Sequence, residues 1–112
     1  MTVGSGGSAV VEVVGELDLA TVPHWEAAVE RAAADAPVVV LDLSTLSFVD
    51  SAGMHSLFRM LSTLEGRSKR LVVVAPPGST VRRLLDILDL TAVALVCDSR
   101  AEALSIPPRS AS

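Results

Sequence analysis

A serine follows an aspartate where one apolar run ends and the next begins, in the segment FVDSAGM at residues 48–54. Asp or Ser in such a place caps free N–H groups at the start of a helix, and one residue is enough. If Asp50 is the cap, Ser51 takes the first helical position with its hydroxyl outward, near Gly53. A phosphate there would meet the positive end of the helix dipole and unpaired N–H groups. The residues alone leave two interpretations of Ser51 open, a pure cap and a regulatory phosphorylation site.

Hydrolytic chemistry is a first alternative, because Ser51 and His55 lie four residues apart and would share a helix face near Asp50. A hydrolase nucleophile normally has glycines two residues away on either side, and Val49 takes the place of the first one here. No separate acid is evident to orient His55. The sequence therefore disfavours a serine hydrolase, and we expect no enzymatic activity.

Metal, nucleotide and phosphoaspartate sites are not indicated either. His24 lacks further ligands at metal-binding spacing and is better interpreted as a histidine on a helix surface. The Gly- and Pro-rich segments 4–8 and 76–80 lack the lysine of a phosphate-binding loop. Asp42 lies inside an apolar run without the paired acids of a receiver domain. We expect no cofactor and no metal.

Charge and hydropathy narrow the class of protein further. The formal net charge is −4 and no block of Lys and Arg is concentrated enough to suit nucleic acid or an anionic membrane. No apolar run approaches the ~18 residues that would span a bilayer. The single cysteine, Cys97, lies in an apolar run and is expected to be a buried hydrophobe, which fits a reducing compartment. These features predict a cytoplasmic protein.

The positions of these residues depend on alternating strands and helices. Val-rich and nearly continuous apolar runs predict strands, and apolar residues at three- and four-residue steps predict helices. Thr21 and Ser79 are expected to cap helices, and Pro23 suits a first turn. The expected strands are 9–14, 38–43, 71–75 and 92–96, and the expected helices begin near 22, 51, 80 and 99.

This alternation predicts a single α/β domain with a largely parallel sheet, because parallel neighbours need helical crossovers of about this length. The core of the domain is expected to span residues 9–106. Residues 1–8 would form a flexible N-terminus or a short edge strand, with the N-terminal strands pairing antiparallel at the sheet edge. Residues 107–112 are expected to be a disordered tail.

Several segments together resemble one known family. They are GELDLAT at 15–21, LDLS at 41–44, FVDSAGM at 48–54, RLVVV at 70–74 and VRRLL at 81–85. In this order and spacing, from Val10 to Leu104, they are similar to the anti-sigma factor antagonists, the stand-alone bacterial members of the STAS domain family. The resemblance implies a mixed, mostly parallel sheet of four to five strands with about four helices packed mainly on one face.

The same resemblance implies a regulator that works by partner switching. The unphosphorylated form would bind an anti-sigma factor that is also a serine kinase of the histidine-kinase-like ATPase fold, and so free a sigma factor. Phosphorylation of Ser51 would end this binding, and a serine phosphatase would restore it. Neither nucleic acid nor membrane would be a partner.

Carried over by position, the partner-binding surface would combine the loop at 47–50, the exposed start of the following helix and a neighbouring acidic turn. Its expected members are Glu16, Asp18, Ser47, Asp50, Ser51, Gly53 and Met54. Glu16 and Asp18 could instead be solvated turn residues. The remaining alternative for the whole protein is a STAS interaction or scaffold module whose serine is never phosphorylated.

Two residues depart from the pattern of the family. Ala52 stands where many relatives have Ser or Thr, so Ser51 is the only hydroxyl available within the motif. His55 stands where relatives often have Gly, and its bulk is expected to alter partner choice.

Overall fold

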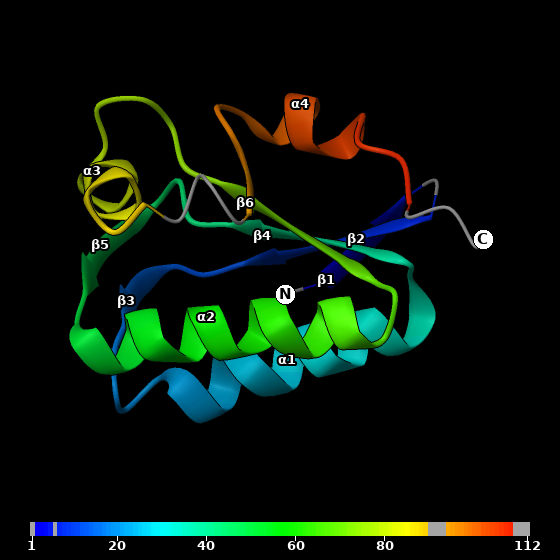
Figure 1. The fold of residues 1–112 in the computed structure, drawn as a ribbon, viewed down its shortest axis with the longest axis horizontal. Coiled ribbons are helices and arrows are strands. Elements are labelled where there is room, and N and C mark those ends of the chain that lie inside the picture. Colours follow the sequence, from blue (N-terminus) through cyan, green and yellow to red (C-terminus); the bar gives the residue numbers. More distant parts are fainter. Residues whose placement is uncertain (1, 6, 90–93, 109–112) are drawn as a thin grey trace.

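The computed structural model describes residues 2–5, 7–89 and 94–108 (Figure 1). Strands and helices alternate along most of the chain, as the sequence predicts. The strands are β1 (Thr2–Ser5), β2 (Ser8–Glu12), β3 (Gly15–Leu17), β4 (Val38–Asp42), β5 (Leu46–Val49), β6 (Arg70–Val74) and β7 (Leu95–Cys97). The helices are α1 (Val22–Asp35), α2 (Ser51–Gly66), α3 (Thr80–Ile87) and α4 (Arg100–Leu104).

The main sheet has five strands in the order β1-β2-β4-β6-β7. β2, β4, β6 and β7 run parallel to one another, while β1 pairs antiparallel with β2 at one edge. The mixed, mostly parallel α/β sheet expected from the sequence is therefore confirmed. Its parallel strands are joined by helical crossovers, as parallel neighbours require.

Both faces of the sheet are covered, which explains why β4 is apolar without interruption. On one face Val39 and Leu41 enter a large core with α1 and α2, to which α3 adds Val81 and Leu85. On the other face a smaller core gathers around Ala103 of α4. Figure 1 shows α1 and α2 side by side below the sheet and α4 above it. No helix among the described residues is long and apolar enough to cross a membrane.

A second, two-stranded sheet pairs β3 with β5 in parallel. The sequence analysis placed Glu16 in a turn and residues 47–50 in a loop, but Glu16 lies in β3 and residues 47–49 lie in β5. Gly15, at φ +88°, turns the chain out of β2, and the Asp42 carboxylate accepts hydrogen bonds from the N–H and hydroxyl of Ser44 (2.9 and 2.6 Å) just after β4. These two turns lead into short segments that pair with each other.

Of the helix caps expected from the sequence, Asp50 and Ser79 are confirmed and Thr21 is not, while Ser99 is a further cap. Asp50, Ser79 and Ser99 each accept a hydrogen bond from an N–H in the first turn of their helix. Thr21 precedes α1, but its side chain makes no capping hydrogen bond. Its hydroxyl instead accepts from the Asp18 N–H (2.9 Å) and donates to the Glu16 carbonyl (3.0 Å), so it holds the β3–α1 turn.

Parts of two predictions at the C-terminal end lie outside the described residues. The last strand, expected at 92–96, is observed as β7 at Leu95–Cys97, and residues 90–93 are not described. Of the expected tail at 107–112, only Pro107 and Pro108 are described.

Candidate functional site

Asp50 and Ser51 occupy the start of α2 as the cap and the first helical residue. The Asp50 backbone is extended, and its Oδ1 accepts a hydrogen bond from the Gly53 N–H at 2.8 Å. Since Asp50 supplies the cap, the Ser51 hydroxyl is not needed for this role. Ser51 is exposed, which agrees with the sequence expectation of an outward hydroxyl.

β3 lies directly beside the start of α2. The Asp50 N–H donates to the Leu17 carbonyl at 3.1 Å, and Asp50 Oδ2 accepts from the Leu19 N–H at 3.4 Å. Between β5 and β3, the Ser47 hydroxyl donates to the Gly15 carbonyl at 2.7 Å. These bonds join the segment around Ser51 to an acidic segment more than thirty residues away in the chain.

The predicted exposure of Gly53 and Met54 is wrong, because both are buried. A Cβ added to Gly53 would lie 2.2 Å from the Leu17 carbonyl oxygen. Gly53 therefore allows β3 to pack against α2, and Met54 points into the main core. Neither residue therefore contributes to the exposed surface at the start of α2.

The two predicted acids differ in their surroundings. Glu16 is exposed and pairs in register with Phe48 of β5. Asp18 is half-buried, and its Oδ1 accepts a hydrogen bond from the Thr21 N–H at 3.0 Å. Glu16 is thus free to meet a partner, whereas Asp18 has a structural role in its turn.

Two large apolar side chains near Ser51 are exposed. The sequence analysis included Phe48 only as part of the loop at 47–50, and it did not assign Leu19 to the site. Phe48 is 51% exposed and Leu19 is 74% exposed. A signal for Phe48 existed in the sequence, because it belongs to the same short segment as Ser51. We call the exposed set Glu16, Leu19, Ser47, Phe48 and Ser51, together with Asp50, the Ser51 face.

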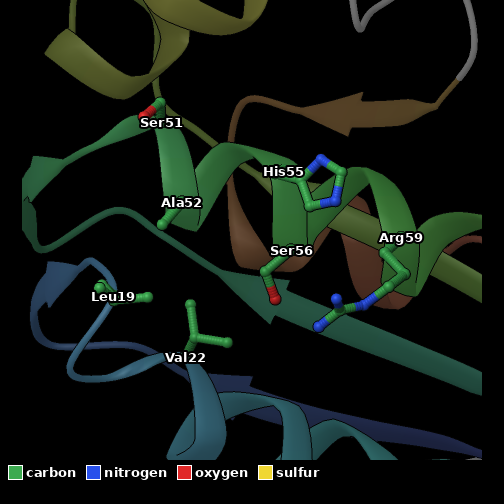
Figure 2. Close-up of a pocket in the computed structure, with 7 residues that line it drawn as sticks. All are labelled: Leu19, Val22, Ser51, Ala52, His55, Ser56 and Arg59. Carbon is green, nitrogen blue, oxygen red and sulfur yellow. The ribbon is translucent and has the colours of Figure 1, made fainter.

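A groove of about 520 Å³ runs from Ser51 along α2 toward α1. Its walls are Leu19 and Val22 on one side and α2 on the other (Figure 2). The α2 residues that line it are Ser51, Ala52, His55, Ser56 and Arg59. Glu26 of α1 accepts hydrogen bonds from two of these side chains, the buried Ser56 hydroxyl and Arg59. The groove therefore combines an apolar wall at Leu19 and Val22 with hydroxyl, imidazole and guanidinium groups along α2.

A partly buried ion pair, between exposed Arg100 and buried Asp42, lies on the opposite face of the sheet. Arg100 of α4 donates from Nε to Asp42 Oδ2 at 2.9 Å, and Arg100 Nη2 lies 2.8 Å from the same oxygen. Burial alone would raise the pKa of Asp42, but hydrogen bonds from Ser44 and Arg100 outweigh it and the pKa is lowered. The same hydrogen bond raises the pKa of Arg100. These contacts attach α4 to the end of β4.

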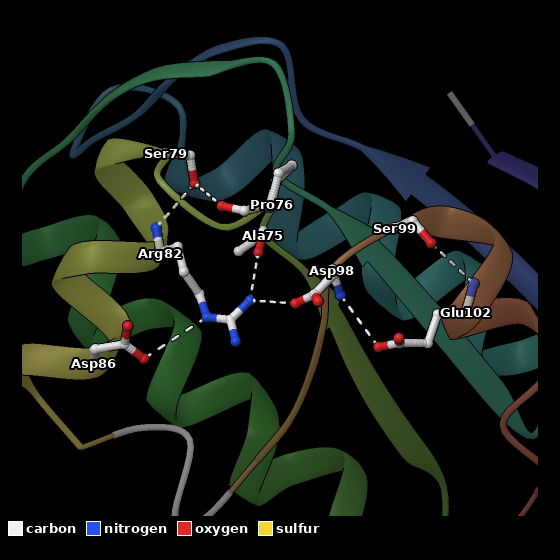
Figure 3. Close-up of polar contacts among 8 residues, drawn as sticks. All are labelled: Ala75, Pro76, Ser79, Arg82, Asp86, Asp98, Ser99 and Glu102. Atoms are coloured by element: carbon white, nitrogen blue, oxygen red, sulfur yellow. Dashed lines mark hydrogen bonds and ion pairs between the residues drawn. The ribbon is translucent and has the colours of Figure 1, made fainter.

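A second polar network fixes α3 to the ends of β6 and β7 (Figure 3). Arg82 donates to the Ala75 carbonyl and to Asp98, both at 2.8 Å. The hydrogen bond to Asp98 raises the pKa of Arg82. Because α3 contacts β5, this network supports the strand that leads into Asp50.

Cys97 and His24 are the remaining candidates for chemistry that the sequence analysis named. Cys97 is buried, as predicted, and burial together with Glu102 raises the pKa of its thiol to about 11. His24 is exposed on α1. Within the described ranges, no three His, Cys, Asp or Glu side chains are grouped so that they could hold a metal ion.

Comparison with known proteins finds similar sequences and similar structures. Residues 1–103 match the STAS domain family. The chain is 36% identical over 85 residues to the anti-sigma-F factor antagonist RsfB of Mycobacterium tuberculosis, covering 75% of this chain and 68% of that protein. A crystal structure of an anti-sigma factor antagonist from Mycobacterium paratuberculosis is 31% identical, with a TM-score of 0.82 over 94% of this chain and 89% of that chain.

A more distant structure shares the fold. Bacillus SpoIIAA in its phosphorylated form has a TM-score of 0.69 at 21% identity, over 93% of this chain and 95% of that chain. Together these matches confirm the resemblance to anti-sigma factor antagonists that the sequence motifs indicated.

Proposed function

Because this chain belongs to the STAS domain family, we propose that it is an anti-sigma factor antagonist controlled by phosphorylation of Ser51. The unphosphorylated form binds an anti-sigma factor with serine kinase activity and so frees a sigma factor. The kinase transfers the terminal phosphoryl group of ATP to the Ser51 hydroxyl, which loses its proton, and ADP leaves. A serine phosphatase restores the binding form. The protein is a cytoplasmic regulator with no catalysis of its own.

The observation that carries this proposal is the exposed Ser51 hydroxyl at the first position of α2. Asp50 already provides the cap, so a phosphoryl group on Ser51 removes no bond that holds the helix. A phosphate at this end of a helix is favourable for the fold. The antagonist names of RsfB and of the Mycobacterium paratuberculosis protein support the partner class.

The Ser51 face has the composition of a docking surface. Phe48 and Leu19 offer exposed apolar area, and Glu16 offers a carboxylate for a basic residue of the partner. Phosphorylation places close to two further negative charges beside Asp50, on an interface where like charges are costly. The expected result is loss of binding without loss of the fold.

Two charge variants test the switch. Ser51→Ala should bind the anti-sigma factor like the wild type, and Ser51→Glu should bind about 10-fold more weakly, because one carboxylate copies a phosphate only in part. Ser62→Glu is the matched control, since Ser62 is exposed on the same helix about 16 Å further along. Isothermal titration calorimetry with the anti-sigma factor measures the affinities of the three variants and of the wild type.

Phosphorylation itself is followed by intact-mass measurement after incubation with the anti-sigma factor and ATP. A gain of one phosphate, absent in Ser51→Ala, supports the proposal. If no phosphate is gained and Ser51→Glu binds as tightly as Ser51→Ala, the chain is an interaction module without a phosphorylation switch.

A further inference from the structure

We propose that His55 holds the phosphate of phosphorylated Ser51 and is the residue that positions the modified side chain. This inference rests on the proposed function, because it concerns the phosphorylated form. Ser51 and His55 are one helical turn apart and both line the groove beside α2. Figure 2 shows both on the same side of α2, with Ala52 and Ser56 in a second row toward α1.

The spacing suits a pair between an anion and a cation. Residues four apart on a helix have Cβ atoms about 5–6 Å from each other, and an anion N-terminal to a cation is the favoured order. In Figure 2 the His55 ring extends along α2 away from Ser51, so the imidazole meets the phosphate after rotation about its side-chain bonds, which its exposure allows. A phosphoryl group extends the serine side chain far enough to meet the imidazole.

The other charged groups near the groove are not available to bind the phosphate. Asp50 carries a negative charge next to the phosphate, which increases the demand for a cation. Arg59 is two turns from Ser51 and is paired with Glu26 of α1. In the β3–α1 turn, Asp18 is bound within its own turn. In the part of the chain that the structure describes, His55 has neither a hydrogen bond nor an ion pair.

Two consequences follow for the switch. When His55 is protonated, its charge offsets part of the phosphate charge and fixes the direction of the phosphate. The second ionisation of a phosphoserine lies at about pH 6, so a cation held beside the phosphate can be detected through a shift of that ionisation.

The test uses the full chain with phosphoserine placed at position 51 during translation, so that no kinase is needed. The ³¹P resonance is followed from pH 5 to 8 in the wild type, His55→Gln and His55→Lys. A nearby cation favours the phosphate dianion, so the titration midpoint should lie about 0.5 lower in the wild type than in His55→Gln. His55→Lys should keep the low midpoint.

His24→Gln is the matched control, because His24 is the second of the two histidines and lies on α1 away from this groove. It should leave the midpoint unchanged. Equal midpoints in the wild type and His55→Gln would overturn the inference. Failure of the kinase or binding assays would instead count against the proposed function, because those assays do not enter the ³¹P experiment.

Discussion

Gly53 shows how a single residue determines the geometry of the Ser51 face. The Leu17 carbonyl lies so close that even a methyl group cannot be placed there without moving backbone. The sequence analysis expected Gly53 in an exposed helix start, because that surface was carried over by position from the family resemblance. Only the packing of β3 against α2 reveals that the position is buried.

Gly53→Ala is expected to lower the free energy of unfolding by about 2–3 kcal/mol, because overpacking must displace β3 or the start of α2. Urea unfolding followed by circular dichroism measures the change. Gly66→Ala is the control, since nothing lies within 4 Å of its added Cβ, and it should be neutral or stabilising by up to about 1 kcal/mol. Equal stability of Gly53→Ala and the wild type would contradict the close packing.

At the scale of elements, the main-sheet strands and the helices were predictable, and the short strands β3 and β5 were not. β4 and β6 are buried on both faces and read as continuous apolar runs, and α2 has a regular apolar stripe. β3 and β5 have only three and four residues with mixed exposure. Their pairing depends on a neighbour distant in sequence, so local pattern carries no signal for it.

The attachment of α4 to β4 through Arg100 and Asp42 predicts a pH dependence. The pKa of Asp42 is lowered in the folded state, so its contribution to stability is present above its ordinary value of 3.8 and is lost as pH falls through the folded value. Asp42→Asn should cost about 1–2 kcal/mol at pH 7, and this difference should shrink below about pH 4.

Unfolding in urea between pH 2 and 7 measures this difference. Asp35→Asn is the control, because Asp35 is exposed at the end of α1, and it should change the unfolding free energy by less than about 0.5 kcal/mol at any pH. A difference between Asp42→Asn and the wild type that stays constant down to pH 2 would show that the ion pair does not carry the effect.

At the scale of the whole molecule, the reactivity of the Cys97 thiol measures how often the folded domain opens. Cys97 is the single cysteine of the chain, it is buried at the end of β7, and the pKa of its thiol is raised to about 11. The folded state holds this proton more tightly than the unfolded one. Stability from this group is therefore present below its ordinary value of 9.0 and falls as pH rises through about 11.

We expect native Cys97 to react with a thiol reagent at pH 8 at least about 100-fold more slowly than the urea-unfolded chain, because both thiolate formation and access are suppressed. Absorbance of the released thiol product measures both rates. In a Cys97→Ala, Ser62→Cys variant the thiol lies on the exposed face of α2 and should react rapidly in the folded state. Equal rates for Cys97 in the folded and unfolded chains would contradict its burial.

Asp50 connects three parts of the molecule at one point. Its carboxylate binds the N–H groups of Gly53 and Leu19, and its own N–H binds the Leu17 carbonyl. The outline of the Ser51 face is consequently set before any encounter, so recognition needs no ordering step on this side. Association should then be governed by diffusion and charge, and the rate of capture should fall with added salt while the bound geometry stays the same.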